Sequence, residues 1–266
     1  MGKSTGKSIR TMLAALGALA LTAGVAVADK VTIAVGGAGC LCYLPTMLAE
    51  QLGEYKKAGV EVELVDFKGG SQSLTAVIGG SADVVSGYFD HCVNLAAKNQ
   101  ALEAFVVYDR YPGLALVVGP KQTGKINSVK DLKDKKVSVS TAGSLTYWLT
   151  MQLSRSQGWG TGGINIVPLG AAQAQIAALK THQIDGVTTD SVTVYKMVED
   201  GSGRILVKFG DSVKDFHVHV IYASNKLIQS NPEALKAFLA GWLETIRFMR
   251  DNKDKSIALA AKLTDT

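Results

Sequence analysis

The feature that most constrains the fold is a regular alternation of short β-rich runs with amphipathic helical segments. The β-rich runs occupy residues 31–35, 60–67, 83–86 and 104–108, and the helical segments between them occupy 44–52, 71–78 and about 90–98. This alternation is typical of an α/β fold with mainly parallel strands. The first part of the chain therefore predicts a complete βαβαβ lobe.

A similar order recurs later in the chain. Strand-like runs are expected at 136–140, 164–168 and 186–189, and helices at 144–157, 171–180 and from about 191. Leu74 and Asp83 have counterparts 102 residues later in Ile176 and Asp185. Because identity between the halves is low, we interpret the recurrence as a structural duplication.

The two lobes divide the chain into segments. We expect lobe 1 to begin with residues 29–112, a hinge crossing at 113–120, lobe 2 at 121–214, and a return crossing with the second part of lobe 1 at 215–266. The fold class is therefore α/β, with two βαβ lobes joined by a two-segment hinge. The sequence stops within a helical pattern, from which a truncated C-terminus is expected.

The N-terminal segment has the pattern of a secretory signal peptide. Lys3, Lys7 and Arg10 precede an apolar run at 12–27, and the triplet Ala26-Val27-Ala28 closes it. A membrane-spanning helix is the alternative, but the run is short for a span and ends in a cleavage-like site. We therefore expect residues 1–28 to be removed and the mature chain to be periplasmic.

The charge balance bears on possible partners. The full sequence has 28 basic and 23 acidic residues and a net charge of +5. Without the signal segment, 25 basic residues remain against the same 23 acidic ones, which gives +2. A nearly neutral chain without a Lys/Arg stripe argues against nucleic acid as a partner.

Several motifs resemble a known family in their order and spacing. They are Tyr43-Leu44-Pro45, residues 53–62 (GEYKKAGVEV), Gly69-Gly70, residues 78–84 (IGGSADV) and residues 126–137 (INSVKDLKDKKV). Together they resemble the substrate-binding proteins of the nitrate, sulfonate, taurine and thiamine-precursor (NMT/THI-like) family. The resemblance covers nearly all of residues 29–251.

The resemblance implies a type II periplasmic-binding-protein fold that serves an ABC importer. It implies a small-molecule ligand, taken here as a small organic anion or zwitterion (sulfonate, carboxylate or pyrimidine-like), and an ABC permease of the inner membrane as partner. We expect a monomer with no catalytic residues, no resident metal and no other cofactor. The Cys40-Leu41-Cys42 sequence in the first loop departs from the family pattern, so the resemblance implies no role for these two cysteines.

Ligands of open α/β sheets bind beyond the carboxyl ends of the strands, where loops and helix starts converge. This rule selects five loops, with candidate ligand-binding residues Leu41, Cys42, Tyr43, Gly70, Ser71, Tyr88, Asp90, Thr141, Ser144, Thr146 and Asp190. Ser144 is the preferred anion contact, and a plain helix cap is the alternative. Asp90 and Asp190 suit either a ligand cation or a helix cap.

Three cysteines and one histidine follow two strands that should be neighbours. Cys40 and Cys42 follow the first strand, and His91 and Cys92 follow the third. The alternatives are a Cys/His metal site, a disulfide from Cys92 to Cys40 or Cys42, and simple packing of small thiols. The spacing is not a standard zinc pattern.

Two functions of other classes compete with capture and delivery. An enzyme resembling the pyrimidine synthases of thiamine formation would share the fold, but the export signal and the lack of an evident nucleophile and base pair oppose it. A ligand-sensing module would also share the architecture. Without a helix-turn-helix segment, and exported, it would need a separate membrane receptor.

Overall fold

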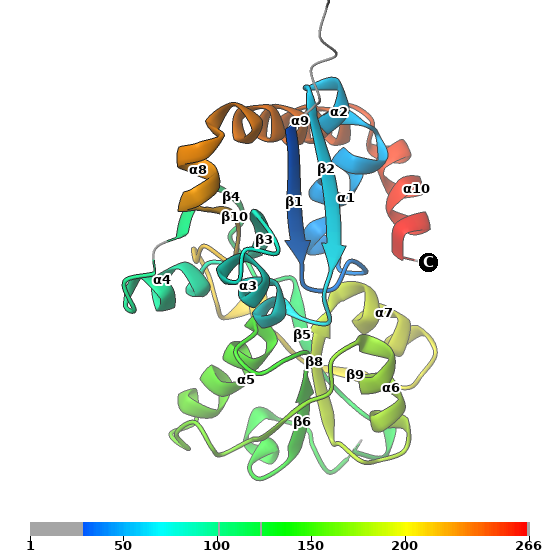
Figure 1. Ribbon diagram of the computed structural model, residues 1–266. Coiled ribbons are helices and arrows are strands. Elements are labelled where there is room, and N and C mark those ends of the chain that lie inside the picture. The colour runs from blue at the N-terminus through cyan, green and yellow to red at the C-terminus, as the bar shows by residue number, and fades with distance from the viewer. Residues whose placement is uncertain (1–28, 101, 123, 265–266) are drawn as a thin grey trace, which may run out of the picture.

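The computed structural model describes residues 29–100, 102–122 and 124–264. The signal peptide expected at 1–28 lies outside these residues. The described chain forms two lobes, each built around a five-stranded sheet (Figure 1). Helices cover the sheets, and the two lobes meet where β1 and β2 of lobe 1 point toward lobe 2.

Lobe 1 contains the sheet β2-β1-β3-β10-β4. Its strands are β1 (Asp29–Val35), β2 (Val60–Asp66), β3 (Val84–Tyr88), β4 (Leu102–Asp109) and β10 (His219–Ser224). Its helices are α1 (Leu44–Gln51), α2 (Glu54–Lys57), α3 (Gly70–Ile78), α4 (Asp90–Ala96), α8 (Asn225–Ser230), α9 (Pro232–Asp251) and α10 (Lys253–Thr264). β1 runs parallel to β2 and β3, whereas β10 runs antiparallel to β3 and β4.

Lobe 2 contains the sheet β7-β6-β8-β5-β9. Its strands are β5 (Leu114–Val118), β6 (Lys136–Val139), β7 (Asn165–Pro168), β8 (Gly186–Asp190) and β9 (Arg204–Lys208), and its helices are α5 (Leu145–Ser156), α6 (Ala172–Lys180) and α7 (Ser191–Glu199). β6 runs parallel to β7 and β8, and β5 runs antiparallel to β8 and β9. The sheet order therefore repeats that of lobe 1, strand for strand.

The duplication read from the sequence has a direct structural counterpart. Helix α3 at 70–78 and helix α6 at 172–180 differ by 102 residues at both ends, and so do β3 at 84–88 and β8 at 186–190. Each lobe adds a fourth strand that arrives from the other lobe, β5 in lobe 2 and β10 in lobe 1. These observations confirm the α/β fold class and the two-lobed architecture expected from the sequence.

The chain crosses between the lobes twice. The first crossing is 110–113 between β4 and β5, because β5 at 114–118 pairs with β8 and β9 and is a strand of lobe 2. The expected crossing at 113–120 therefore lies mostly within that strand. The second crossing, 212–218, runs beside the first, with Val218 N–H donating to the Asp109 carbonyl at 2.8 Å and an ion pair joining Arg110 to Asp215.

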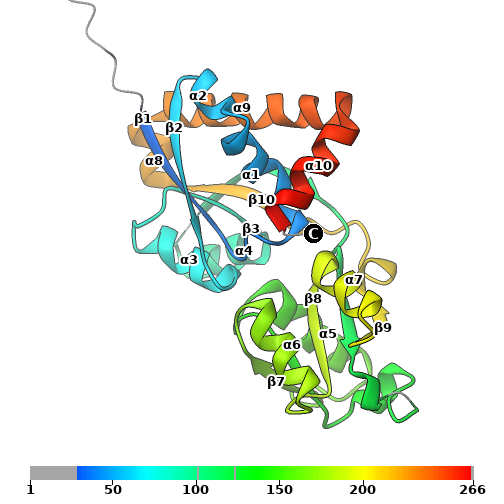
Figure 2. The ribbon, with the colours of Figure 1, turned by 90° about the vertical axis from the view of Figure 1, so that its right-hand side faces the viewer.

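The long helix α9 anchors the core of lobe 1. Asn231 caps it by accepting from the Ala234 N–H at 3.1 Å, and Pro232 occupies its first turn, where a missing N–H is tolerated. Phe238 and Trp242 are buried on its inner face, and Phe238 stacks on Tyr55 at 4.9 Å. Helix α10 then turns from α9 toward the junction of the lobes (Figure 2).

Candidate functional site

A cleft of about 420 Å³ lies between the lobes. Its walls are formed mainly where the parallel strands of each sheet end, as expected for an open α/β sheet. The lining residues fall within 36–43, 66–70, 140–146, 170–176 and 188–193, and also include Tyr88, Leu114, Lys196, His219 and Thr264. Both halves of the duplication thus present equivalent loops to one space.

Seven of the residues selected from the sequence line this cleft, and four do not. Those in the wall are Cys42, Tyr43, Gly70, Tyr88, Ser144, Thr146 and Asp190. Outside it, Leu41 is 40% exposed at the surface, and Asp90 accepts from Asn94 Nδ2 at 2.5 Å within α4. Ser71 and Thr141 bond to each other across the lobes, with Ser71 Oγ donating to Thr141 Oγ1 at 2.8 Å.

The lobes are in close contact along the side of α3 and α4. His91 Nε2 lies 3.2 Å from the Gly143 carbonyl of lobe 2, and His91 Nδ1 lies 3.3 Å from Tyr222 Oη. A side chain on Gly69 would place its Cβ 2.5 Å from Thr141 Oγ1, so this approach requires glycine. Burial lowers the pKa of His91, which favours a neutral ring that donates to the carbonyl.

A triangle of hydroxyls stands at the start of α5. Ser140 Oγ donates to Ser144 Oγ at 3.0 Å, and Thr146 Oγ1 lies 2.9 Å from Ser144 Oγ and 3.0 Å from Ser140 Oγ. Ser144 Oγ also accepts from the Tyr147 N–H at 3.3 Å, so it caps the helix. Each hydroxyl group can donate one hydrogen bond, and one of the three groups could rotate to donate to a bound anion instead of to its neighbour. The helix start adds a favourable partial positive charge.

The two acidic side chains of the cleft are engaged with their own loops. Asp190 accepts from the Thr193 N–H at 3.1 Å and from Thr193 Oγ1 at 2.8 Å, which is the capping role weighed as its alternative. Asp66, which the sequence reasoning did not select, accepts from the N–H groups of Gly37 and Ala38 at 3.0 and 2.8 Å. The carboxylates of Asp66 and Asp190 therefore stabilise the conformations of their loops.

Tyr88 offers a polar atom that has no protein partner. Its side chain is 2% exposed, and its Oη forms no hydrogen bond with any described residue. Burial raises its pKa, so the phenol stays protonated and can donate. Because a buried donor without a partner costs free energy, a ligand or water in the cleft would be stabilised there.

His219 lies opposite Tyr88 in the sheet and was not selected from the sequence. The two residues pair across β10 and β3. His219 Nδ1 lies 2.9 Å from Asp109 Oδ2. The His219 ring stacks on Tyr108 and makes a T-shaped contact with Tyr43, with ring centroids 6.0 and 5.7 Å apart. The imidazole is therefore oriented by the Asp109 carboxylate, as second-layer carboxylates orient functional histidines.

Other lining residues were also missed. Gln173 and Gln175 follow β7, and the carboxyl-end rule would have found them had it been applied to that strand. Lys68 follows β2, and Lys196 comes from the second turn of α7, where its Nζ donates to the Thr264 carbonyl at 3.1 Å. Both lysines bring a positive charge to the cleft.

The cysteines pair differently from the sequence alternatives. Cys40 and Cys42 form a disulfide with each other, and Cys92 is free and buried. β1 and β3 are neighbours as expected, but Cys92 packs on a sheet face with Val85 and Tyr222, away from the first loop. The proposed Cys92 disulfide is therefore wrong. No group of three His, Cys, Asp or Glu suited to a metal occurs among the described residues.

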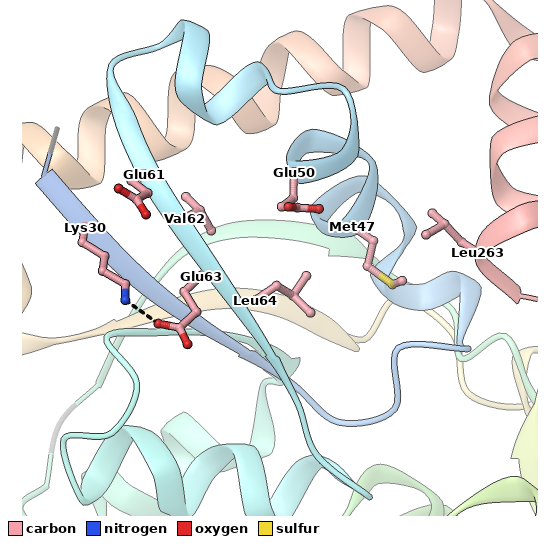
Figure 3. A pocket seen from close by; sticks show the side chains of 8 residues that line it. All are labelled: Lys30, Met47, Glu50, Glu61, Val62, Glu63, Leu64 and Leu263. Carbon is pink, nitrogen blue, oxygen red and sulfur yellow. Dashed lines mark ion pairs between the residues drawn. The ribbon is translucent and has the colours of Figure 1, made fainter.

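A second hollow of about 490 Å³ lies on the outside of lobe 1 (Figure 3). It runs along the edge strand β2 and is lined by Lys30, Met47, Glu50, Glu61, Val62, Glu63, Leu64 and Leu263. Lys30 is already paired with Glu63 at 2.7 Å. Because this hollow involves one lobe and no loop beyond a parallel strand, we place the ligand site in the cleft.

Within the described residues, no helix combines the length and apolar character needed to cross a membrane. A search of the curated proteins found no match. The chain does match the sequence profile described as "NMT1/THI5 like" over residues 43–256. That range includes most of both lobes and the cleft loops.

Solved structures share the architecture. A Bordetella bronchiseptica protein is 30% identical with a TM-score of 0.80, over 87% of this chain and 75% of that one. The alkanesulfonate-binding protein SsuA from Xanthomonas axonopodis, bound to MOPS, is 19% identical with a TM-score of 0.76 (89% and 80%). The periplasmic nitrate-binding protein NrtA from Synechocystis is 15% identical with a TM-score of 0.75 (88% and 66%). The fold is that of the periplasmic binding proteins, and the chain belongs to the NMT1/THI5-like family.

Proposed function

We propose that this chain is the periplasmic solute-binding component of an ABC importer and that it captures a small organic anion or zwitterion between its lobes. The observation that carries the proposal is the set of polar atoms converging on one inter-lobe cleft. The hydroxyl triangle of Ser140, Ser144 and Thr146 is joined there by the unpartnered Tyr88 Oη. Such convergence of a few polar groups in a cleft between domains is typical of a ligand site.

The charge pattern favours an acidic group on the ligand. Lys68 and Lys196 line the cleft together with the start of α5, and no arginine lines it within the described residues. A sulfonate or carboxylate can accept from hydroxyls and ammonium groups without the bidentate clamp that arginine provides. Tyr43 and Tyr88 add aromatic side chains to the wall of the cleft, which suits an apolar or pyrimidine-like body.

The relatives are compatible with this ligand class. The Xanthomonas protein holds MOPS, which carries both a sulfonate and a ring amine, and the Synechocystis protein binds nitrate. In our proposal the cationic part of a zwitterion would lie near the carboxylate of Asp66 or Asp190, both of which line the cleft. A purely anionic ligand would leave these carboxylates to their loop contacts.

Capture requires the lobes to move. Among the described residues the chain passes between the sheets at two short crossings, 110–113 and 212–218, which is the arrangement of a hinge between two rigid bodies. A ligand that contacts both lobes favours the closed form by its differential affinity. The closed monomer would then dock on the permease of the inner membrane and release its ligand without chemical change.

The proposal is tested on protein exported to the periplasm. Its intact mass should correspond to a chain beginning at Asp29, and a retained signal segment would contradict periplasmic delivery. Native mass spectrometry without added ligand should reveal a small bound molecule. Calorimetry with MOPS, ethanesulfonate, nitrate and a pyrimidine carboxylate should find binding of at least one anion. Recovery of a chemically altered molecule would instead support an enzyme.

A further inference from the structure

The disulfide between Cys40 and Cys42 lies in the wall of the cleft. Both cysteines line it and both are partly exposed, and Leu41 between them is 40% exposed. The Cys40 N–H donates to the Gly37 carbonyl at 3.0 Å, and the Cys42 N–H donates to Cys40 Sγ at 3.2 Å. Both cysteines also pack against Val35, Tyr43 and Met47, so the disulfide is half-buried at the surface of the cleft.

The third cysteine provides an internal contrast. Cys92 is 7% exposed and packs against the sheet of lobe 1. Burial raises the pKa of its thiol to about 11, so little of the reactive thiolate forms at neutral pH. Its burial and its high pKa both make Cys92 an inert thiol, unlike the pair in the cleft.

Stabilisation of the fold is a weak explanation for this disulfide. A disulfide stabilises mainly by restricting the unfolded chain, and the restriction grows with the length of the closed loop. Here a single residue, Leu41, separates the two cysteines. The loop is also held by other contacts, because Asp66 Oδ1 accepts from the N–H groups of Gly37 and Ala38. A role at the cleft surface explains the position of the disulfide better.

We propose that Cys40 and Cys42 form a redox-active pair that exchanges with dithiols and sets the rigidity of the cleft wall. A thiolate of a small dithiol, or of a dithiol protein, attacks one sulfur and breaks the Sγ–Sγ bond. The other cysteine leaves as a thiolate and takes up a proton. The second thiol of the reductant, as a thiolate, then attacks the reductant's own sulfur in the mixed disulfide, and the remaining cysteine leaves as a thiolate that takes up a proton. The products are two cysteine thiols and the oxidised, cyclic or disulfide-bonded, reductant.

The consequence for the cleft passes through Tyr43. This residue follows Cys42 directly in the same 3-10 turn and is 5% exposed, and its ring makes a T-shaped contact with that of His219, with the ring centroids 5.7 Å apart. Reduction removes a covalent restraint from the turn that positions Tyr43, so the 36–43 loop should become more mobile. A lower affinity for the ligand should follow, and this last step alone rests on the proposed function.

The test uses the mature chain in its native state, treated with dithiothreitol as the dithiol. Alkylation with iodoacetamide followed by peptide mass analysis should show no label before reduction. After reduction, Cys40 and Cys42 should be labelled while Cys92 stays unlabelled. Amide hydrogen exchange in residues 36–43 should become several-fold faster on reduction, whereas exchange in the equivalent loop of lobe 2, residues 140–146, should stay the same.

Two variants test whether Cys40 and Cys42, and not Cys92, cause the response to reduction. The double substitution Cys40→Ser with Cys42→Ser should exchange as fast as the reduced protein and no longer respond to dithiothreitol, whereas Cys92→Ala should respond as the natural chain does. Free thiols at Cys40 and Cys42 before reduction, labelling that requires denaturant, or unchanged exchange after reduction would each overturn the proposal. These readouts need no ligand, so they are independent of whether any transport ligand is found.

Discussion

Replacing Ser144 with alanine separates ligand binding from helix capping. The Ser144 hydroxyl accepts from the Tyr147 N–H at 3.3 Å, and loss of an N-cap hydroxyl costs about 1 kcal/mol of stability. The same hydroxyl belongs to the triangle with Ser140 and Thr146. Loss of one hydrogen bond to a charged ligand costs about 1.5–3 kcal/mol, which corresponds to a roughly ten- to hundredfold rise in Kd.

Ser224 supplies the matched control. It caps α8 by accepting from the Leu227 N–H at 3.2 Å and does not line the cleft. Ser224→Ala should therefore lose about the same stability as Ser144→Ala, about 1 kcal/mol, while ligand affinity stays unchanged. Thermal unfolding measures the loss of stability, and calorimetry with an anion that binds the natural chain measures the loss of affinity. If Ser144→Ala also kept full affinity, its hydroxyl would be only a cap.

Two further predictions concern buried groups at the junction of the lobes. Tyr88→Phe removes an Oη that has no protein partner, so calorimetry should show weaker ligand binding, by about tenfold, with no loss of thermal stability; a loss of stability with full affinity would contradict the contact. Burial lowers the pKa of His91 in the folded state below the unfolded-state pKa of about 6.5. The neutral His91 ring therefore contributes its full stability above about pH 6.5, and this stability is lost as the pH falls toward the folded-state pKa. Thermal unfolding followed from about pH 8 to pH 5 should therefore show a decline that His91→Gln flattens, and an equal acid sensitivity of both proteins would refute this origin.

The fold was predictable because its signal is distributed over many residues. Hydrophobic periodicity predicted most of the strands and helices. Asp83 and Asp185, which are 102 residues apart, each directly precede the third strand of their lobe, β3 and β8. Both carboxylates accept a hydrogen bond from a backbone N–H of the neighbouring parallel strand, that of Thr32 for Asp83 and that of Lys136 for Asp185. The repeated residue thus performs the same local task twice.

The site was less predictable because some of its residues do not lie at the carboxyl ends of parallel strands, where ligands of open α/β sheets usually bind. The carboxyl ends of parallel strands led to Tyr88 and Ser144, which line the cleft. His219 stands at the amino end of an antiparallel strand, and it reaches the cleft only because the second crossing delivers β10 next to β3. Lys196 lies within a helix, and no local pattern distinguishes it from a solvated lysine.

The pairing of Cys40 with Cys42 depends on loop geometry that the sequence pattern does not encode. Cys92 follows β3, a neighbour of β1, but it lies in α4 and its side chain packs in the core with Val85. The first loop instead curls into a 3-10 turn at Leu41–Tyr43, which brings the two nearby sulfur atoms together. Only the three-dimensional path of each loop separates these outcomes.

The central claim is that one small molecule is held by both lobes in the inter-lobe cleft. Amide hydrogen exchange with and without the bound molecule tests it most directly. We expect the bound molecule to protect the lobe 1 loop at 36–43 and the lobe 2 loop at 140–146 together, with no change along β2 at the outer hollow of Figure 3. Protection confined to β2 and α10, or to a single lobe, would contradict it.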